Sequence, residues 1–220
     1  MARIARVVVP GYPHHITQRG NRRQRTFFCD EDYAVYLDLM REWCAKCAVE
    51  IWGYCLMPNH VHLIAVPREA EDLCRAMGEA HRRYTRYINF REGWRGYLWQ
   101  GRFSSFVMDE PHLVAAVRYV ELNPVRAGLA GKAWGYPWSS AAAHLRAEDD
   151  GLVRIAPLKG IIGDWKSYLE EPINEGEVEK LRKASSTGRP LGDELFVAGL
   201  ERQLMRPLHR RKPGRKACAN

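Results

Sequence analysis

The chain has 220 residues, of which 46% are hydrophobic and 10% aromatic, so it can bury a sizeable core and is not a disordered chain. Its apolar runs fall short of the roughly 20 residues that a membrane span needs, which excludes a membrane-spanning protein. We expect one domain of ordinary size with an appendage.

The formal net charge of +8 is concentrated at the two ends. Residues 1–25 carry six arginines and no acidic residue, and residues 201–220 carry seven basic residues against Glu201. The segment between them is therefore net acidic. This distribution favours a polyanionic partner, nucleic acid above all, although a solvated basic tail is the alternative.

The six cysteines show no disulfide framework, and no signal peptide precedes them. Cys44 and Cys47 form a CxxC pair inside a helical pattern, with no second pair beside it. Buried free thiols of a cytoplasmic protein are favoured over a zinc site.

The first half of the chain alternates predicted strands and helices. Strands are predicted from period-2 alternation or short apolar runs at 12–20, 49–55, 60–66 and 103–108. Helices are predicted after a cap at Asp30, over about 71–90, and from 109–111 to an end set by Pro124. This order indicates a ferredoxin-like α+β fold, an antiparallel sheet with helices on one face.

The second half is predicted to be helical and less regular. A Gly- and Trp-rich connection over 128–138 leads to a small helix at 139–145, and the polar stretch 148–151 marks a boundary. We therefore expect one domain over 1–147 and a helical, basic extension over 148–220, whose charge suits DNA binding. Helices at 175–184 and 193–205 form either a helix-turn-helix or a packing arm.

Two histidines stand out in the third predicted strand. His60 and His62 are two residues apart, so both project from one face, while Val61 and Leu63 project from the other. Two neighbouring imidazoles suit one divalent cation. The alternative is a half-buried strand whose histidines happen to face solvent.

The third predicted helix carries a second pair of polar residues. Tyr119 and Asn123 lie one turn apart on a flank beside the apolar stripe of the helix. A tyrosine there often only packs, but beside a metal site its hydroxyl can act as a covalent nucleophile. The amide could then complete the metal shell.

Two segments have the composition of a nucleic-acid contact. Residues 21–25 form an Arg-rich loop without an apolar residue, which could grip a phosphate backbone. Residues 94–103 interleave aromatic side chains with Arg and Gly, as stacking on unpaired bases requires. The alternative for the second segment is a Gly-kinked loop that packs its Trp into the core.

These motifs together resemble a known family. Met57-Pro58-Asn59-His60-Val61-His62-Leu63 is similar to the HUH motif of single-strand nucleases, and Tyr119 with Asn123 resembles the single-tyrosine motif of IS200-like transposases. The segments 15–21, 98–103 and 187–192 resemble, more narrowly, the REP-associated tyrosine transposases, which are tied to repetitive extragenic palindromes (REPs) in bacterial genomes. No second Tyr follows Tyr119 at i+3 or i+4.

The resemblance implies an HUH endonuclease-type transposase that cleaves single-stranded DNA beside a hairpin. Tyr119 would attack the scissile phosphorus and form a 5′-phosphotyrosine link, with His60 and His62 as catalytic metal ligands. Asn123 would be the third ligand, and the metal would be Mg²⁺ or Mn²⁺. Imidazole ligands suit Mn²⁺ better than Mg²⁺.

The expected partner is single-stranded or hairpin DNA, with no small-molecule substrate and no membrane. The expected DNA contacts are Arg19, Arg22, Arg23, Arg25, Arg82, Arg83, Trp99, Arg102, Arg210, Arg211, Lys212 and Arg215. We expect a monomer or homodimer in the bacterial cytoplasm, at the nucleoid. A non-catalytic hairpin-binding protein, an RNA-binding ferredoxin-like module and a replication initiator are the alternatives.

Overall fold

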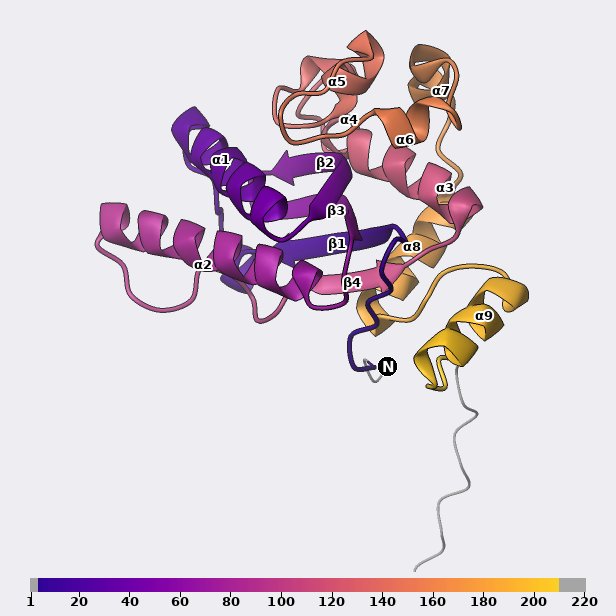
Figure 1. Ribbon diagram of the computed structural model, residues 1–220. Helices are drawn as coiled ribbons and strands as arrows, with labels where there is room; N and C mark the ends of the chain where they lie inside the picture. Colours follow the sequence, from indigo (N-terminus) through magenta and orange to yellow (C-terminus); the bar gives the residue numbers. More distant parts are fainter. Residues whose placement is uncertain (1–3, 210–220) are drawn as a thin grey trace, which may run out of the picture.

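Four short strands form the centre of the structure, a computed structural model that describes residues 4–209. They are β1 (His14–Arg19), β2 (Val49–Met57), β3 (His60–Pro67) and β4 (Ser104–Val107), paired antiparallel in the order β2-β3-β1-β4 (Figure 1). With α1 (Asp30–Lys46) and α2 (Asp72–Glu92), the chain follows the βαββαβ order of the ferredoxin-like fold. The predicted α+β class is confirmed.

One face of the sheet is closed by an apolar core beneath α1 and α2. Val61 and Leu63 of β3 point into this core and are fully buried, as are Tyr36 of α1 and Tyr84 of α2. The alternation of β3 therefore places its apolar residues where the sequence predicted them, and sends His60 and His62 to the opposite face.

The second face of the sheet is also covered, so the prediction of helices on one face is wrong. Helices α3 (Glu110–Glu121) and α8 (Glu175–Thr187) lie on this face, toward the right of the sheet in the view of Figure 1. The reason is that Ile64 and Phe106 point there and are fully buried in a second apolar cluster. An uncovered face would expose this apolar surface to water.

Strand register brings three strands' polar residues together on the second face. In the β1–β3 pair His62 lies opposite Thr17, and in the β2–β3 pair it lies opposite Cys55. A tight Pro58-Asn59 turn joins β2 to β3 and fixes this register.

Two helix ends differ from prediction. Asp30 is the first residue of α1 rather than its cap. The N-cap is Cys29, whose backbone N–H donates a hydrogen bond to the Asp32 carboxylate. α3 ends at Glu121, and Asn123 opens the short helix α4 (Asn123–Arg126) with Pro in its first turn. Proline is tolerated there because its missing N–H has no partner at a helix start.

The C-terminal part of the described chain packs onto the sheet domain. Its elements, besides α4 and α8, are the 3₁₀ turn Ala133–Gly135, α5 (Ala141–Arg146), α6 (Ala156–Lys159), α7 (Trp165–Glu170) and α9 (Glu194–Leu204). α8 contacts β1, β4 and α3, and Leu200 of α9 packs with Val7 and Val9. Helices α8 and α9 thus pack against the sheet domain as an arm. The domain boundary at 147–148 stays a prediction. None of the helices in residues 4–209 is long and apolar enough to span a membrane.

Candidate active site

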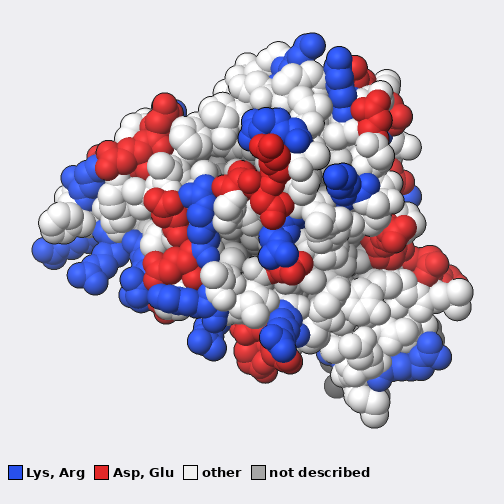
Figure 2. All heavy atoms as spheres, turned by 45° about the horizontal axis from the view of Figure 1, so that its top comes forward, with Lys and Arg blue, Asp and Glu red and all other residues white. Residues whose placement is uncertain are grey.

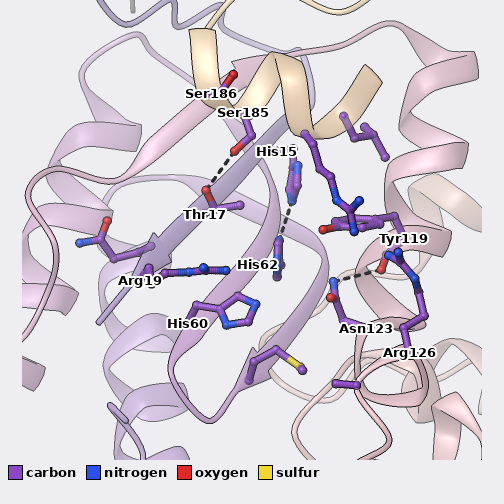
Figure 3. A pocket seen from close by; sticks show the side chains of 15 residues that line it. His15, Thr17, Arg19, His60, His62, Tyr119, Asn123, Arg126, Ser185 and Ser186 are labelled. Carbon is purple, nitrogen blue, oxygen red and sulfur yellow. Dashed lines mark hydrogen bonds between the residues drawn. The ribbon is translucent and has the colours of Figure 1, made fainter. Parts of the chain in front are cut away.

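A cavity of about 530 Å³ lies between the second face of the sheet and helices α3, α4 and α8 (Figure 3). We call it the reaction cavity. Its polar lining residues are His15, Thr17, Gln18, Arg19, His60, His62, Tyr119, Asn123, Arg126, Arg182, Ser185 and Ser186. The four residues predicted for catalysis and metal binding therefore meet in one place, although β3 is far in the sequence from α3 and α4, which carry Tyr119 and Asn123.

His60 and His62 each keep one ring nitrogen free. The ring centroids are 5.0 Å apart. His60 Nδ1 donates to Asn59 Oδ1 at 2.6 Å, and His62 Nδ1 shares a hydrogen bond of 2.9 Å with His15 Nε2. Both Nε2 atoms are left without a protein partner among the described residues. This is the arrangement of metal-binding histidines, which use the second nitrogen to fix the orientation of the ring.

Burial keeps these imidazoles neutral at physiological pH. It lowers the pKa of His60 to about 4, helped by the nearby Arg19 charge, and lowers the pKa of His15 to about 3. Burial also holds the pKa of His62 well below its usual value, with smaller contributions from the other two histidines and Arg19. Neutral imidazoles have a lone pair to offer a cation.

Tyr119 projects from α3 toward the two strands. Its ring stands edge-on to the rings of His62 and His15, at centroid distances of 5.6 and 6.1 Å. Figure 3 shows its hydroxyl end directed into the reaction cavity. No residue among 4–209 hydrogen-bonds this hydroxyl, so it is available for an external phosphate. The ring also packs against the second apolar cluster, so this Tyr both packs and directs its hydroxyl into the cavity.

Asn123 can add an oxygen ligand to the two nitrogens. Its Nδ2 donates to the backbone oxygen of Tyr119 at 3.1 Å, and its Oδ1 accepts no hydrogen bond from the residues that the structure describes. Residues 4–209 contain no group of three His, Cys, Asp or Glu side chains that could hold a metal, Cys44 and Cys47 included. The donor set is thus two imidazoles and one amide, which fits Mn²⁺ and, less well, Mg²⁺.

Sequence reasoning missed His15, which is 2% exposed and touches both sides of the site. Its Nδ1 is buried with no partner in the described chain. The available signal was the alternation of His15, Thr17 and Arg19 in β1. That signal identifies the site only when the pairing of β1 with β3 is known, because pairing decides which face they share.

The reaction cavity is lined by cations and by no Asp or Glu. Arg19 was predicted as a DNA contact, whereas Arg126 and Arg182 were not. The guanidinium of Arg126 also lies 5.2 Å from the centre of the Tyr119 ring. A site of this charge favours a phosphodiester.

The other predicted DNA contacts lie outside this cavity. Arg22, Arg23 and Arg25 are exposed in the loop that follows β1, and Arg82 and Arg83 are exposed on α2, where both pair with Glu79. Arg102 is exposed beside β4. The predicted contacts Arg210, Arg211, Lys212 and Arg215 fall outside the described residues.

Trp99 is placed differently from the stacking surface that the sequence suggested. Its ring is only 6% exposed and packs against Tyr36, Tyr84 and His81. A base could stack on it only if it left the core. The core-packing alternative therefore describes Trp99, while Tyr97 in the same loop is 87% exposed.

The chain is similar to one known family and to solved structures. The sequence profile of the family described as "Transposase IS200 like" matches residues 9–123. A solved structure of a REP-associated tyrosine transposase bound to a REP hairpin is 21% identical, with a TM-score of 0.58 over 70% of this chain and 90% of that one. A proposed transposase from Deinococcus radiodurans R1 is 22% identical, with a TM-score of 0.39 over 54% of this chain and 95% of that one. No curated protein matches the chain.

Proposed function

This chain belongs to the IS200-like transposase family, and we propose that it is a metal-dependent endonuclease and strand transferase for single-stranded DNA, acting through a covalent 5′-phosphotyrosine intermediate. The observation that carries the proposal is the reaction cavity itself. It brings together four polar atoms that have no hydrogen-bond partner within residues 4–209: the Tyr119 hydroxyl, Nε2 of His60, Nε2 of His62 and Oδ1 of Asn123.

His60, His62 and Asn123 would hold one divalent cation, Mn²⁺ or Mg²⁺. When bound, the cation supplies Lewis-acid polarisation of a phosphoryl oxygen and charge neutralisation. His15 and Asn59 position the two imidazoles through their hydrogen bonds. Arg126 and Arg182 add fixed positive charge for the phosphodiester on the helical side of the cavity.

Tyr119 would be the nucleophile. Its hydroxyl oxygen attacks the scissile phosphorus, a bond from this oxygen to phosphorus forms, and the bond from phosphorus to the 3′ oxygen breaks. The phenolic proton passes to water, and the departing 3′ oxygen takes a proton. An incoming 3′-OH reverses the same step and joins two strands.

We propose hairpin-forming DNA, of the REP class, as the substrate. The structural neighbour of similar fold was solved with a REP hairpin, and the cation-lined, acid-free cavity of this chain suits a nucleic-acid backbone. Every group of the centre comes from one chain, so a monomer is sufficient for it, and the nucleoid is the proposed place of action. A non-catalytic hairpin binder is less favoured, because all four groups are present.

The test is cleavage of hairpin oligonucleotides taken from palindromes that flank the gene, with Mn²⁺ and with a chelator. The wild-type chain should cut one strand, retain the 5′ end on the protein, and lose this activity with the chelator. Tyr119→Phe should abolish cutting and leave hairpin affinity within about threefold, since it removes one hydroxyl. Tyr12→Phe, an exposed Tyr outside the cavity, is the matched control. Cutting by the Tyr119→Phe variant would place the nucleophile elsewhere.

A further inference from the structure

The loop that follows β1 contains two consecutive residues with a left-handed backbone, Arg22 with φ 53° and Arg23 with φ 61°. Residues other than Gly, Asn and Asp avoid this region because their Cβ atom crowds the backbone. Such strain persists only where the surrounding contacts impose it, and it is concentrated at functional sites. The contacts of residues 20–24, which we call the strained loop, show what imposes this conformation.

The two arginine side chains do not impose it. Figure 2 shows Lys and Arg side chains interspersed with Asp and Glu on the face in view, and Arg41, Lys46 and Arg82 form ion pairs with neighbouring acidic residues. Arg22 and Arg23 are exposed, and neither side chain forms an ion pair or a hydrogen bond within the described part of the chain. The strained conformation therefore depends on the backbone of the loop.

Backbone hydrogen bonds close the strained loop and fasten it to the turn between β2 and β3. The Arg23 N–H donates to the Gly20 oxygen at 3.0 Å, and the Gln24 N–H donates to the Asn21 oxygen at 2.9 Å. The Gly20 N–H donates to the backbone oxygen of Asn59 at 2.9 Å. Residue 20 has to be a glycine, because a Cβ atom there would overlap the backbone oxygen of Gln24.

The Asn59 side chain connects the strained loop to the reaction cavity. Its Nδ2 donates to the backbone oxygen of Arg23 at 3.1 Å, and its Oδ1 accepts from His60 Nδ1 at 2.6 Å. A single planar amide thus spans the distance from the loop to the imidazole. The left-handed backbone at Arg23 therefore presents its carbonyl oxygen to the residue that orients His60.

We propose that the strained loop selects the metal-binding tautomer of His60 through Asn59. The Arg23 oxygen can only accept a hydrogen bond, so it holds the Nδ2 end of the amide. Oδ1 then faces His60 and accepts the proton on Nδ1, which leaves the lone pair of Nε2 for a cation. With the amide reversed, Nδ2 would face Nδ1, and the ring proton would lie on Nε2, where it blocks metal binding.

Gly20, Arg23 and Asn59 are therefore positioning residues for the metal site, although none of them touches the cation. Gly20 lets the loop close, Arg23 supplies the carbonyl oxygen, and Asn59 transmits its position to the imidazole. The inference rests on the proposed function for the presence of a cation at His60. It goes further in placing control of that site in a loop of β1 that lies outside the reaction cavity.

The test measures Mn²⁺ affinity of the full chain without DNA, by electron paramagnetic resonance. Asn59→Ala should weaken Mn²⁺ binding about tenfold, because a metal ligand loses the partner that orients it. Gly20→Ala should weaken it about fivefold, since the added Cβ displaces the loop and with it the Arg23 oxygen. The double variant should bind Mn²⁺ no more weakly than Asn59→Ala alone, because the loop acts through the amide.

Gly131→Ala is the matched control, because Gly131 has no positive φ and an added Cβ would meet no atom within 4 Å. It should bind Mn²⁺ as the wild type does. Losses that add in the double variant, or an equal loss with Gly131→Ala, would overturn the proposal.

A second measurement needs no metal and does not depend on the folding of Gly20→Ala. Nitrogen-15 NMR of the metal-free chain reports which ring nitrogen of His60 carries the proton. It should be Nδ1 in the wild type and a mixture of both nitrogens in Asn59→Ala. A proton on Nε2 in the wild type, or the same tautomer in both chains, would contradict the selection. If the wild type has the Nδ1 proton but binds no Mn²⁺, the tautomer selection stands and the proposed metal site does not.

Discussion

Two buried polar clusters flank α3, and they differ in which hydrogen bonds are already made. On one side, the Glu121 carboxylate is fully buried; its Oε1 accepts from Ser140 and His144, and its Oε2 accepts from Trp165. On the other side, His60, His62, Tyr119 and Asn123 each leave one polar atom at the reaction cavity without a partner in the described part of the chain. Both oxygens of the Glu121 carboxylate are thus bonded, although Nε2 of His144 beside it is buried without a partner in residues 4–209. We call the Glu121 group the closed cluster and the group at the reaction cavity the open cluster, and we expect the first to serve stability and the second chemistry.

The largest expected effect is the loss of cleavage when a metal-binding histidine of the open cluster is removed. His60→Ala should lower Mn²⁺-dependent cleavage at least about a hundredfold, because it removes a ligand of the cation that neutralises the phosphoryl charge. The melting temperature should change little, since the ring lies at the cavity edge. His112→Ala, a half-buried His of α3 that does not line the cavity, is the control. Unchanged cleavage by His60→Ala would remove this histidine from the metal site.

A substitution in the closed cluster should lower stability and leave cleavage by the folded protein intact. Glu121→Ala should cost about 3 kcal/mol of unfolding free energy, because it leaves the buried donors of Ser140, His144 and Trp165 without their acceptor. Chemical denaturation measures this loss, and Glu79→Ala, which removes only two ion pairs with exposed arginines of α2, should cost much less. The folded fraction should still cut DNA. Loss of cutting at full stability would mean that Glu121 belongs to the chemistry.

Substitution of His15 tests whether its hydrogen bond to His62 strengthens metal binding. His15→Phe should keep the ring volume but weaken Mn²⁺ binding about tenfold, since His62 loses the partner that orients it. His15→Gln, which keeps a polar group there, should weaken it less. Metal titration followed by electron paramagnetic resonance measures both without a cleavage assay. Equal affinity in wild type and His15→Phe would show that His62 is held by packing alone.

The smallest expected effect is at the third ligand. Asn123→Ala should raise the Mn²⁺ concentration needed for half-maximal cleavage about threefold to tenfold, because water can replace one neutral oxygen ligand. Asn123→Asp should lower it, since a carboxylate binds the cation more strongly. The same concentration for Asn123→Ala and wild type would remove Asn123 from the shell.

The sequence was sufficient for features that depend on local periodicity. The two-residue repeat placed His60 and His62 on one face, and the helical repeat placed Tyr119 and Asn123 on one flank. Features that depend on packing between distant segments could not be predicted from local periodicity. His15 required the register of β1 against β3, and Arg182 required the position of α8. For Trp99 the sequence left base stacking and core packing open, because burial of one ring in an aromatic loop is decided by the core that receives it.

The measurement that tests the account most directly is identification of the residue that carries the DNA. A hairpin oligonucleotide is cut in the presence of Mn²⁺, the protein is digested, and the peptide bearing nucleotides is sequenced by mass spectrometry. The account predicts a single adduct, at Tyr119, joined to the 5′ end of the cut strand. An adduct on another residue, or cutting with no adduct while both strand ends are free, would contradict the reaction centre formed by β3 and α3.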